Sequence, residues 1–249
     1  MVNSKFITVV YSAAIFLMIG SLTAQFGFQE KYSHISTLFI VLMALPTFYY
    51  FTKSNFKKLI PLVVLLGLFA LVIEGQAVIT GWPYSEFQYS NLIAGKIFGI
   101  VPWTIAFAWT PLLLGWCYLF NPLILKSKLK FIVCVALGLV ATDLLLDPAA
   151  VKAGLWIWED QGSMPFYGIP FQNFVGWFIS GVIGAGIYAW YLNHFKLNLE
   201  QNSAYVLLSL VWTLAFWTGA AVYYDLTWVY IIGFLVYFLV IREFRRIKS

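Results

Sequence analysis

Long apolar runs divide this chain into segments that are too hydrophobic for a water-soluble domain. Eight such runs lie near residues 5–26, 34–52, 58–79, 97–119, 130–147, 171–193, 203–222 and 226–241. A helix needs about 20 apolar residues to cross the hydrocarbon core of a bilayer. Because 62% of the residues are hydrophobic and only 10% are charged, the composition excludes an ordinary soluble fold. We therefore predict an all-α integral membrane protein with about eight transmembrane helices, and we expect no β-strands.

The basic residues test this count, because Lys and Arg concentrate in the cytoplasmic loops of membrane proteins. With eight alternating crossings, 12 of the 15 basic residues fall on the side that holds both termini. The residues on that side are Lys5, Lys53, Lys57, Lys58, Lys126, Lys128, Lys130, Lys196, Arg242, Arg245, Arg246 and Lys248. A count of seven would place the basic C-terminus outside the cell. We therefore predict that both termini are cytoplasmic.

We interpret the net charge of +5 as part of this topology and expect no nucleic-acid partner. The chain shows no soluble domain and no long linker, so we predict a single polytopic membrane domain over residues 1–249. Its expected location is the cell (inner) membrane of a prokaryote, and the lipid bilayer is its expected surrounding. The oligomeric state is left open by the sequence.

Three acidic residues lie inside the predicted membrane helices or at their ends. Asp143 and Asp147 stand near the end of the run 130–147, and Glu74 lies within the run 58–79. An acid in a membrane segment costs roughly 2.5–3.5 kcal/mol on insertion scales, so its presence indicates a functional site. Both helices run outward, and at ~1.5 Å rise per residue Glu74 and Asp143 lie at similar depth. We predict that they face one shared pocket.

The spacing of Asp143 and Asp147 places both carboxylates on one helix face. There they repel each other, so one tends to hold a proton, as a general acid requires. The alternative for Asp147 is that it ends the helix, since a residue before a proline, here Pro148, is pushed out of the helical region. Asn173 opens the run 171–193 on the same side and can orient a water or a carboxylate. Its alternative role is to satisfy backbone groups at the start of the helix.

Two outer loops carry similar patterns. The first reads TGWPYSEFQY and then GKIFGIVPW, and the second reads GLWIWE and then YGIPFQNFVGW. Glu74 precedes Gly81 by seven residues, as Asp147 precedes Gly154. We predict a tandem repeat that relates the third and fourth helices to the fifth and sixth, and repeats often place a site at their interface. The alternative is chance similarity between aromatic membrane loops.

Aromatic residues near these loops are candidates for lining a substrate tunnel. Ring faces stabilise positive charge, although tryptophans at this depth also form the interfacial belt of membrane proteins. The candidates for substrate binding are Trp82, Tyr84, Trp109, Trp156, Tyr167 and Trp177. The two histidines, His34 and His194, fall on opposite sides, so no histidine cluster is available for iron or zinc. We expect neither a metal nor a cofactor.

These two stretches also carry a family resemblance, which covers roughly residues 74–177. The patterns EGQAVITGWPYSEFQY, GKIFGIVPW, DLLLDPAAVKAGLWIWE and YGIPFQNFVGW resemble the membrane carotenoid hydratases, which include bacterial carotenoid 1,2-hydratases and archaeal bisanhydrobacterioruberin hydratases. The heterodimeric and fungal-type lycopene cyclases are more distantly similar. Their second loop is followed by a Pro-x-Glu-Glu motif, where this chain has Pro170-Phe171-Gln172-Asn173. This departure favours a hydratase over a cyclase.

The resemblance implies an enzyme, a carbon–oxygen lyase that adds water across the terminal C1–C2 double bond of an acyclic carotenoid end group. The implied substrates are water and a carotenoid such as lycopene or one like γ-carotene, and no cofactor is implied. Asp143 is our candidate for the general acid, with Glu74 or Asp147 as the group that directs water, and Asn173, Trp177 and Tyr167 as further candidates. A cyclase that uses the same protonation is the first alternative. A transporter of small molecules or lipids is the second, although its acids would lie nearer the midplane.

Overall fold

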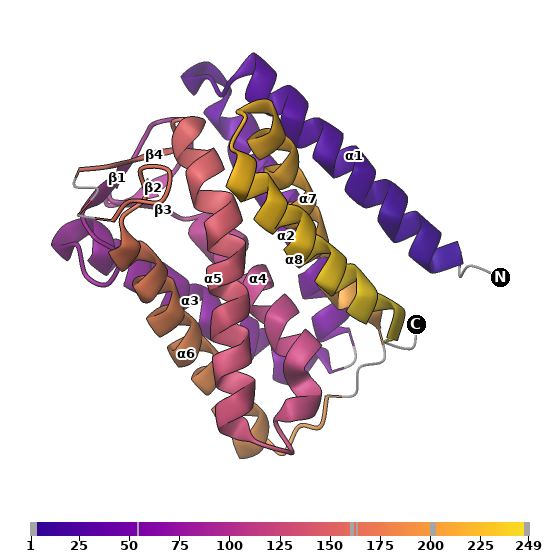
Figure 1. Ribbon diagram of the computed structural model, residues 1–249. Helices are drawn as coiled ribbons and strands as arrows, with labels where there is room; N and C mark the ends of the chain where they lie inside the picture. Colours follow the sequence, from indigo (N-terminus) through magenta and orange to yellow (C-terminus); the bar gives the residue numbers. More distant parts are fainter. Residues whose placement is uncertain (1–3, 54, 160–161, 163, 200–202, 247–249) are drawn as a thin grey trace.

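The computed structural model describes residues 4–53, 55–159, 162, 164–199 and 203–246 (Figure 1). Within these residues the chain forms α1 (Ser4–Phe26), α2 (Ser33–Thr52), α3 (Phe56–Thr80), α4 (Ile105–Phe120), α5 (Lys128–Lys152), α6 (Phe171–His194), α7 (Leu208–Tyr223) and α8 (Thr227–Arg246). Short 3-10 turns precede or follow them at Glu30–Tyr32, Asn121–Leu123 and Ala204–Leu207. Lys248, which entered the orientation argument, lies outside the described residues.

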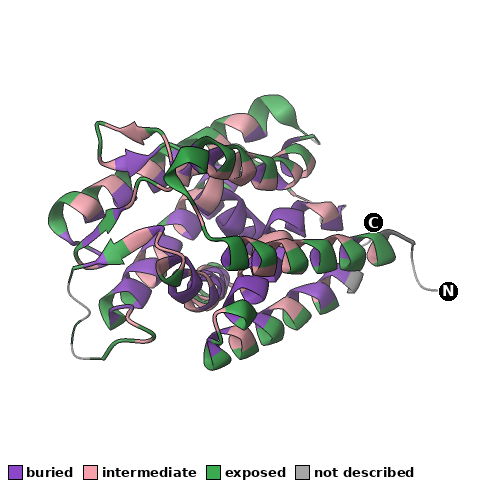
Figure 2. Cartoon of the chain, turned by 90° about the horizontal axis from the view of Figure 1, so that it is seen from above, coloured by how far each residue is buried: buried purple, intermediate pink, exposed green. Residues whose placement is uncertain are grey.

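The helices form one bundle in which α4 lies at the centre (Figure 1). Seven helical segments of the described residues are long and apolar enough to cross a membrane. The helix outside these seven segments is α4, which has 16 residues and buries its Leu112, Leu113 and Leu114 inside the bundle. The start of α1 and the end of α8 lie at the same end of the bundle (Figures 1 and 2), as an even number of crossings requires. The predicted all-α membrane fold is confirmed.

The outer surface of the bundle is apolar. In Figure 2 the buried residues face the centre and the exposed residues face outward. Large apolar side chains such as Tyr11 and Met18 on α1 and Leu235 and Phe238 on α8 are more than half exposed. A water-soluble protein rarely exposes so continuous an apolar surface, whereas the hydrocarbon core of a bilayer covers it at no cost.

Short strands occur at the end of the bundle away from the termini (Figure 1). β1 (Phe87–Tyr89) pairs antiparallel with β4 (Trp156–Trp158), so the two outer loops are joined to each other. β2 (Lys96–Ile97) pairs with β3 (Val101–Pro102) as a hairpin. The expectation that the chain has no strands was therefore wrong. Buried backbone groups of these loops need hydrogen-bond partners, and strand pairing supplies them.

The helix boundaries nearest the two loops differ from the predictions at two places. The fourth helix begins at Ile105 and not near residue 97, because the hairpin occupies residues 96–102. α5 continues through Pro148 to Lys152, so the interpretation of Asp147 as a helix end was wrong. A proline inside a membrane helix is tolerated where neighbouring structure satisfies the freed backbone groups, and Pro148 is buried among other helices.

The two outer loops have similar local backbone geometry. Gly81 and Gly154, which follow α3 and α5, both have left-handed φ, at 73° and 78°. Residues 97–100 and 166–169 each turn through an aromatic residue and a glycine that both have positive φ. The backbone bond that closes the turn is 2.9 Å in the first and 3.1 Å in the second. The two loops thus share their turn geometry, while symmetry of the helix pairs stays a prediction.

Candidate active site

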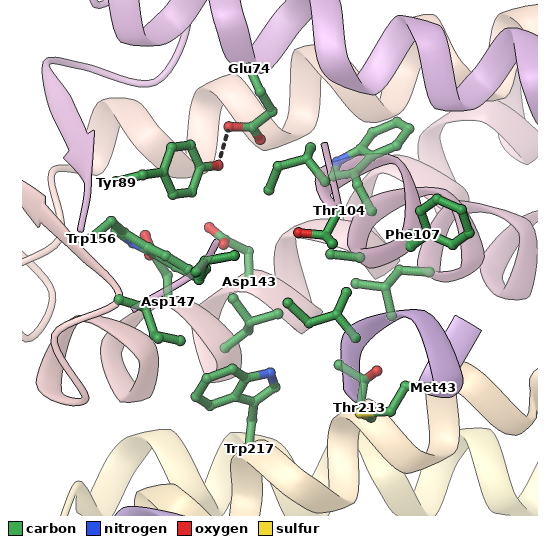
Figure 3. Close-up of a pocket in the computed structure, with 18 of the residues that line it drawn as sticks. Met43, Glu74, Tyr89, Thr104, Phe107, Asp143, Asp147, Trp156, Thr213 and Trp217 are labelled. Atoms are coloured by element: carbon green, nitrogen blue, oxygen red, sulfur yellow. Dashed lines mark hydrogen bonds between the residues drawn. The ribbon is translucent and has the colours of Figure 1, made fainter. Parts of the chain in front are cut away.

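A cavity opens inside the bundle beneath the paired loops (Figure 3). Its empty volume is about 1200 Å³ including the open mouth, and its walls come from α2 to α7 and from both loops. Most of the lining is apolar or aromatic. The polar side chains gather towards the loops, where Glu74 comes from α3, Asp143 and Asp147 from α5, and Asn173 from α6. The predicted pocket shared by Glu74 and Asp143 is present.

The two aspartates are joined through one amide group. Asn173 Nδ2 donates to Asp143 Oδ2 at 2.7 Å and to Asp147 Oδ2 at 2.8 Å. The backbone N–H of Asn173 is bonded separately to the carbonyl of Pro170 at 3.0 Å. The side-chain amide therefore serves the carboxylates of α5 and not the start of α6. This geometry fixes the rotamers of both acids, because an NH₂ group has only two hydrogens to give.

The two aspartates differ in their remaining oxygens. Asp147 Oδ1 accepts a hydrogen bond from the indole N–H of Trp156 on β4, so both oxygens of Asp147 are engaged. Asp143 Oδ1 is buried and has no hydrogen-bond partner among the described residues. Asp143 itself is fully buried and lines the cavity. Asp143, and not Asp147, therefore has a carboxyl oxygen available to bond a ligand.

Glu74 has its own fixed partner. The hydroxyl of Tyr89 donates to Glu74 Oε2 at 2.9 Å, as Figure 3 shows. Burial, together with the nearby charge of Glu74, raises the pKa of Tyr89 well above its usual value near 10. The phenol therefore remains a hydrogen-bond donor at any physiological pH. Tyr89 was not among the predicted site residues.

Tyr84 closes the cavity against α6. Its hydroxyl and Ser180 Oγ are 2.7 Å apart, with either atom as donor. A Cβ at Gly176 would lie 2.3 Å from Tyr84 Cδ1, so the glycine leaves the space in which this ring packs. Burial raises the pKa of Tyr84 well above its ordinary value, with the charge of Glu74 as the second cause. The Tyr84 side chain is thus an uncharged, closely packed part of the cavity wall.

Most of the residues predicted for the site line this cavity. They are Glu74, Tyr84, Trp109, Asp143, Asp147, Trp156, Asn173 and Trp177. Trp82 and Tyr167 do not belong to the lining: Trp82 is 49% exposed beyond the end of α3, and Tyr167 is 39% exposed. The hydroxyl of Tyr167 instead accepts a bond from the backbone N–H of Trp228 at 3.3 Å.

Several lining residues were not predicted. Those beyond the acidic end include Ser36, Phe39, Met43, Thr104, Phe107, Thr213 and Trp217. The residues from α2 and α7 lie in uniformly apolar runs, where no sequence signal separates a cavity wall from a lipid-facing side chain. Within the described ranges, no three His, Cys, Asp or Glu side chains come together as a metal-binding group.

The fold and the cavity define an integral membrane protein with a buried acidic cluster at one end of an apolar chamber. The sequence model of the family described as carotenoid biosynthesis protein matches residues 32–240, and the chain belongs to this family. A bisanhydrobacterioruberin hydratase from Haloarcula japonica is 34% identical over 172 residues. That match covers 67% of this chain and 57% of the relative, so it spans less than two thirds of the relative's length. No solved structure matches the chain.

Proposed function

We propose that the protein is a carotenoid hydratase, a carbon–oxygen lyase that adds water across the terminal C1–C2 double bond of an acyclic carotenoid end. The observation that carries this proposal is the cluster of three buried carboxyl side chains at one end of an aromatic cavity, in a chain of the carotenoid biosynthesis family. The name of the similar Haloarcula protein supports the same reaction class. We also propose a prokaryotic cell (inner) membrane as its location, with the basic loops on the cytoplasmic side.

Asp143 is the proposed general acid. Its Oδ1 is the buried carboxyl oxygen without a partner, so a proton held there can reach a double bond in the cavity. The electron pair of the double bond takes the proton at C2, the less substituted carbon, and the positive charge appears at the tertiary C1. Indole faces such as those of Trp156 and Trp177, which line the same cavity, stabilise this cation.

Glu74 is the proposed partner of Asp143 in the second half of the reaction. It faces the acidic end of the cavity from the opposite helix (Figure 3), and Tyr89 holds its Oε2. A water molecule bonds to C1 through its oxygen, and the carboxylate accepts the proton that this oxygen releases. Transfer of this proton from Glu74 to Asp143 through water restores both groups. The net change is one water added and no electron transferred.

Asp147 has a positioning role in this scheme. Both of its oxygens are occupied, by Asn173 and Trp156, so it offers no free oxygen to the substrate. It anchors the amide of Asn173, which in turn holds Asp143. The apolar walls from α2, α4 and α7 suit the polyene chain of a carotenoid, because its transfer from lipid requires no polar contacts.

Expression in cells that accumulate lycopene tests this function directly. We expect carotenoids that have gained the mass of one water per reacted end. Glu74→Gln should abolish the hydrated product, while Glu86→Gln, at an exposed loop acid outside the cavity, should leave it unchanged. A cyclised product of unchanged mass would show that the protein acts as a cyclase and not as a hydratase. Unaltered carotenoids in cells that contain the folded protein would contradict both and favour a transporter.

A further inference from the structure

Thr104 occupies the N-cap position of α4, but its hydroxyl does not cap the helix. A threonine at this position usually accepts a bond from a backbone N–H of the first turn. Here the side chain makes no such bond. The N–H groups of Phe107 and Ala108 are instead bonded to the main-chain carbonyl of Thr104, both at 2.8 Å. These two N–H groups are therefore satisfied without the hydroxyl.

The hydroxyl of Thr104 is buried and faces the acidic end of the cavity. Thr104 is 0% exposed, and its Oγ1 has no hydrogen-bond partner among the described residues. It lines the same cavity as Asp143, and in Figure 3 its oxygen points towards that carboxylate. Asp143 Oδ1 also lacks a partner. Burying two polar atoms without hydrogen-bond partners destabilises the folded protein. A water molecule that bonds to both atoms removes this destabilisation.

We propose that Thr104 is a positioning residue that holds the water captured by the carbocation. This inference rests on the proposed hydration and adds a residue that orients its second reactant. The water donates one O–H to Thr104 Oγ1 and the other to the carboxylate of Glu74, the proposed acceptor of its proton, which leaves a lone pair directed at C1. The new bond joins the water oxygen to C1. The carboxylate takes the released proton, so atoms and charges balance.

The position of the water decides what happens to the cation. Protonation at C2 by Asp143 does not need the hydroxyl of Thr104, whereas capture at C1 does. Without a placed water, the cation returns to an alkene by losing a proton from C2 or from a neighbouring methyl group. In D₂O, such return introduces deuterium into recovered carotenoid that has gained no oxygen.

The test measures both outcomes in membranes that contain the full chain and lycopene in D₂O buffer. Thr104→Val keeps the shape of the side chain and removes the hydroxyl, and Thr104→Ser restores a hydroxyl. Thr110→Val is the matched control, because Thr110 is on the same helix, fully buried and also without a partner for Oγ1, yet does not line the cavity. The readout is the ratio of hydrated product to deuterium-exchanged, unhydrated carotenoid. This ratio does not depend on how much protein folds.

We expect Thr104→Val to lower this ratio by about tenfold, the effect of one lost hydrogen bond, and Thr104→Ser to restore most of it. Thr110→Val should match the unsubstituted protein. An unchanged ratio in Thr104→Val, or an equal loss of hydration and exchange, would overturn the inference. If the unsubstituted protein itself forms no hydrated product, the proposed function fails, which is a separate result.

Discussion

The side-chain amide of Asn173 on α6 donates to Asp143 Oδ2 on α5 at 2.7 Å. The same nitrogen bonds Asp147 at 2.8 Å, so one residue aligns both carboxylates of the pair. Asp143 keeps its other oxygen for the cavity. The orientation of the proposed acid therefore depends on a contact between two helices.

Asn173→Leu should lower the hydration rate per folded protein by about 100-fold. The loss of both amide bonds lets Asp143 leave its orientation, and a misplacement near 1 Å can cost this much. The measurement is product formation in membranes with the protein quantified by immunoblot. Asn121→Ala is the control, because Asn121 also donates at 2.7 Å, to the carbonyl of Leu199, but lies outside the cavity. A rate in Asn173→Leu equal to that of the control would contradict the role given to this amide.

Tyr89→Phe should lower the rate by about 10- to 100-fold. It removes the donor to Glu74 Oε2, and a hydrogen bond to a charged group contributes about 1.5–3 kcal/mol. Tyr188→Phe serves as the comparison, since Tyr188 is also buried but makes only a 3.4 Å bond to Asn121, outside the cavity. Equal rates in the two variants would show that the Tyr89 hydroxyl does not support Glu74.

Trp156→Phe should lower the rate more than Trp158→Phe, by about tenfold. The two tryptophans lie on β4 and both line the cavity. The indole N–H of Trp156 donates to Asp147, whereas Trp158 Nε1 has no partner among the described residues. Product formation by the two variants, compared at equal protein level, isolates that hydrogen bond. A larger loss of rate in Trp158→Phe would mean that ring packing affects the reaction more than the hydrogen bond from Trp156 to Asp147.

The helices were predictable because membrane crossing demands long apolar runs. The helix boundaries that were predicted wrongly are those that tertiary structure determines. The hairpin at 96–102 has strands of two residues, too short to leave a periodic pattern. α5 passes through Pro148, which is buried inside the bundle. Pro46, Pro61 and Pro111, which fall within the predicted apolar runs, also lie inside helices, so a proline in such a run does not mark a helix end here.

The acids of the site were predictable because burying a carboxyl group is costly and therefore rarely accidental. Tyr89 and Thr104 carry no such signal. Their burial follows from how the outer loops fold over the cavity, which apolar periodicity does not encode. The same reason explains why Trp156 lines the cavity and Trp82 does not: both are loop tryptophans in the sequence, and only the loop path separates them.

The predicted orientation can be tested with two cysteine variants at exposed positions. Phe98 at the tip of the hairpin is 94% exposed, and Leu125 between α4 and α5 is 88% exposed. A membrane-impermeant maleimide should label Phe98→Cys in intact cells and Leu125→Cys only after the membrane is broken. The unsubstituted protein, with Cys117 buried and Cys134 half-buried, measures the background. Labelling of Leu125→Cys alone in intact cells would reverse the topology.

The central claim is that the Asp143 carboxyl group starts the addition of water to a carotenoid end. Its most direct test is the incorporation of heavy oxygen from labelled water into carotenoid, by membranes that contain the unsubstituted protein or Asp143→Asn. The asparagine keeps the size of the side chain but has no proton of sufficient acidity to give. We predict heavy oxygen in the product of the unsubstituted protein and none above background with Asp143→Asn. Incorporation by Asp143→Asn at the unsubstituted rate, with the protein at its normal level, would contradict the claim.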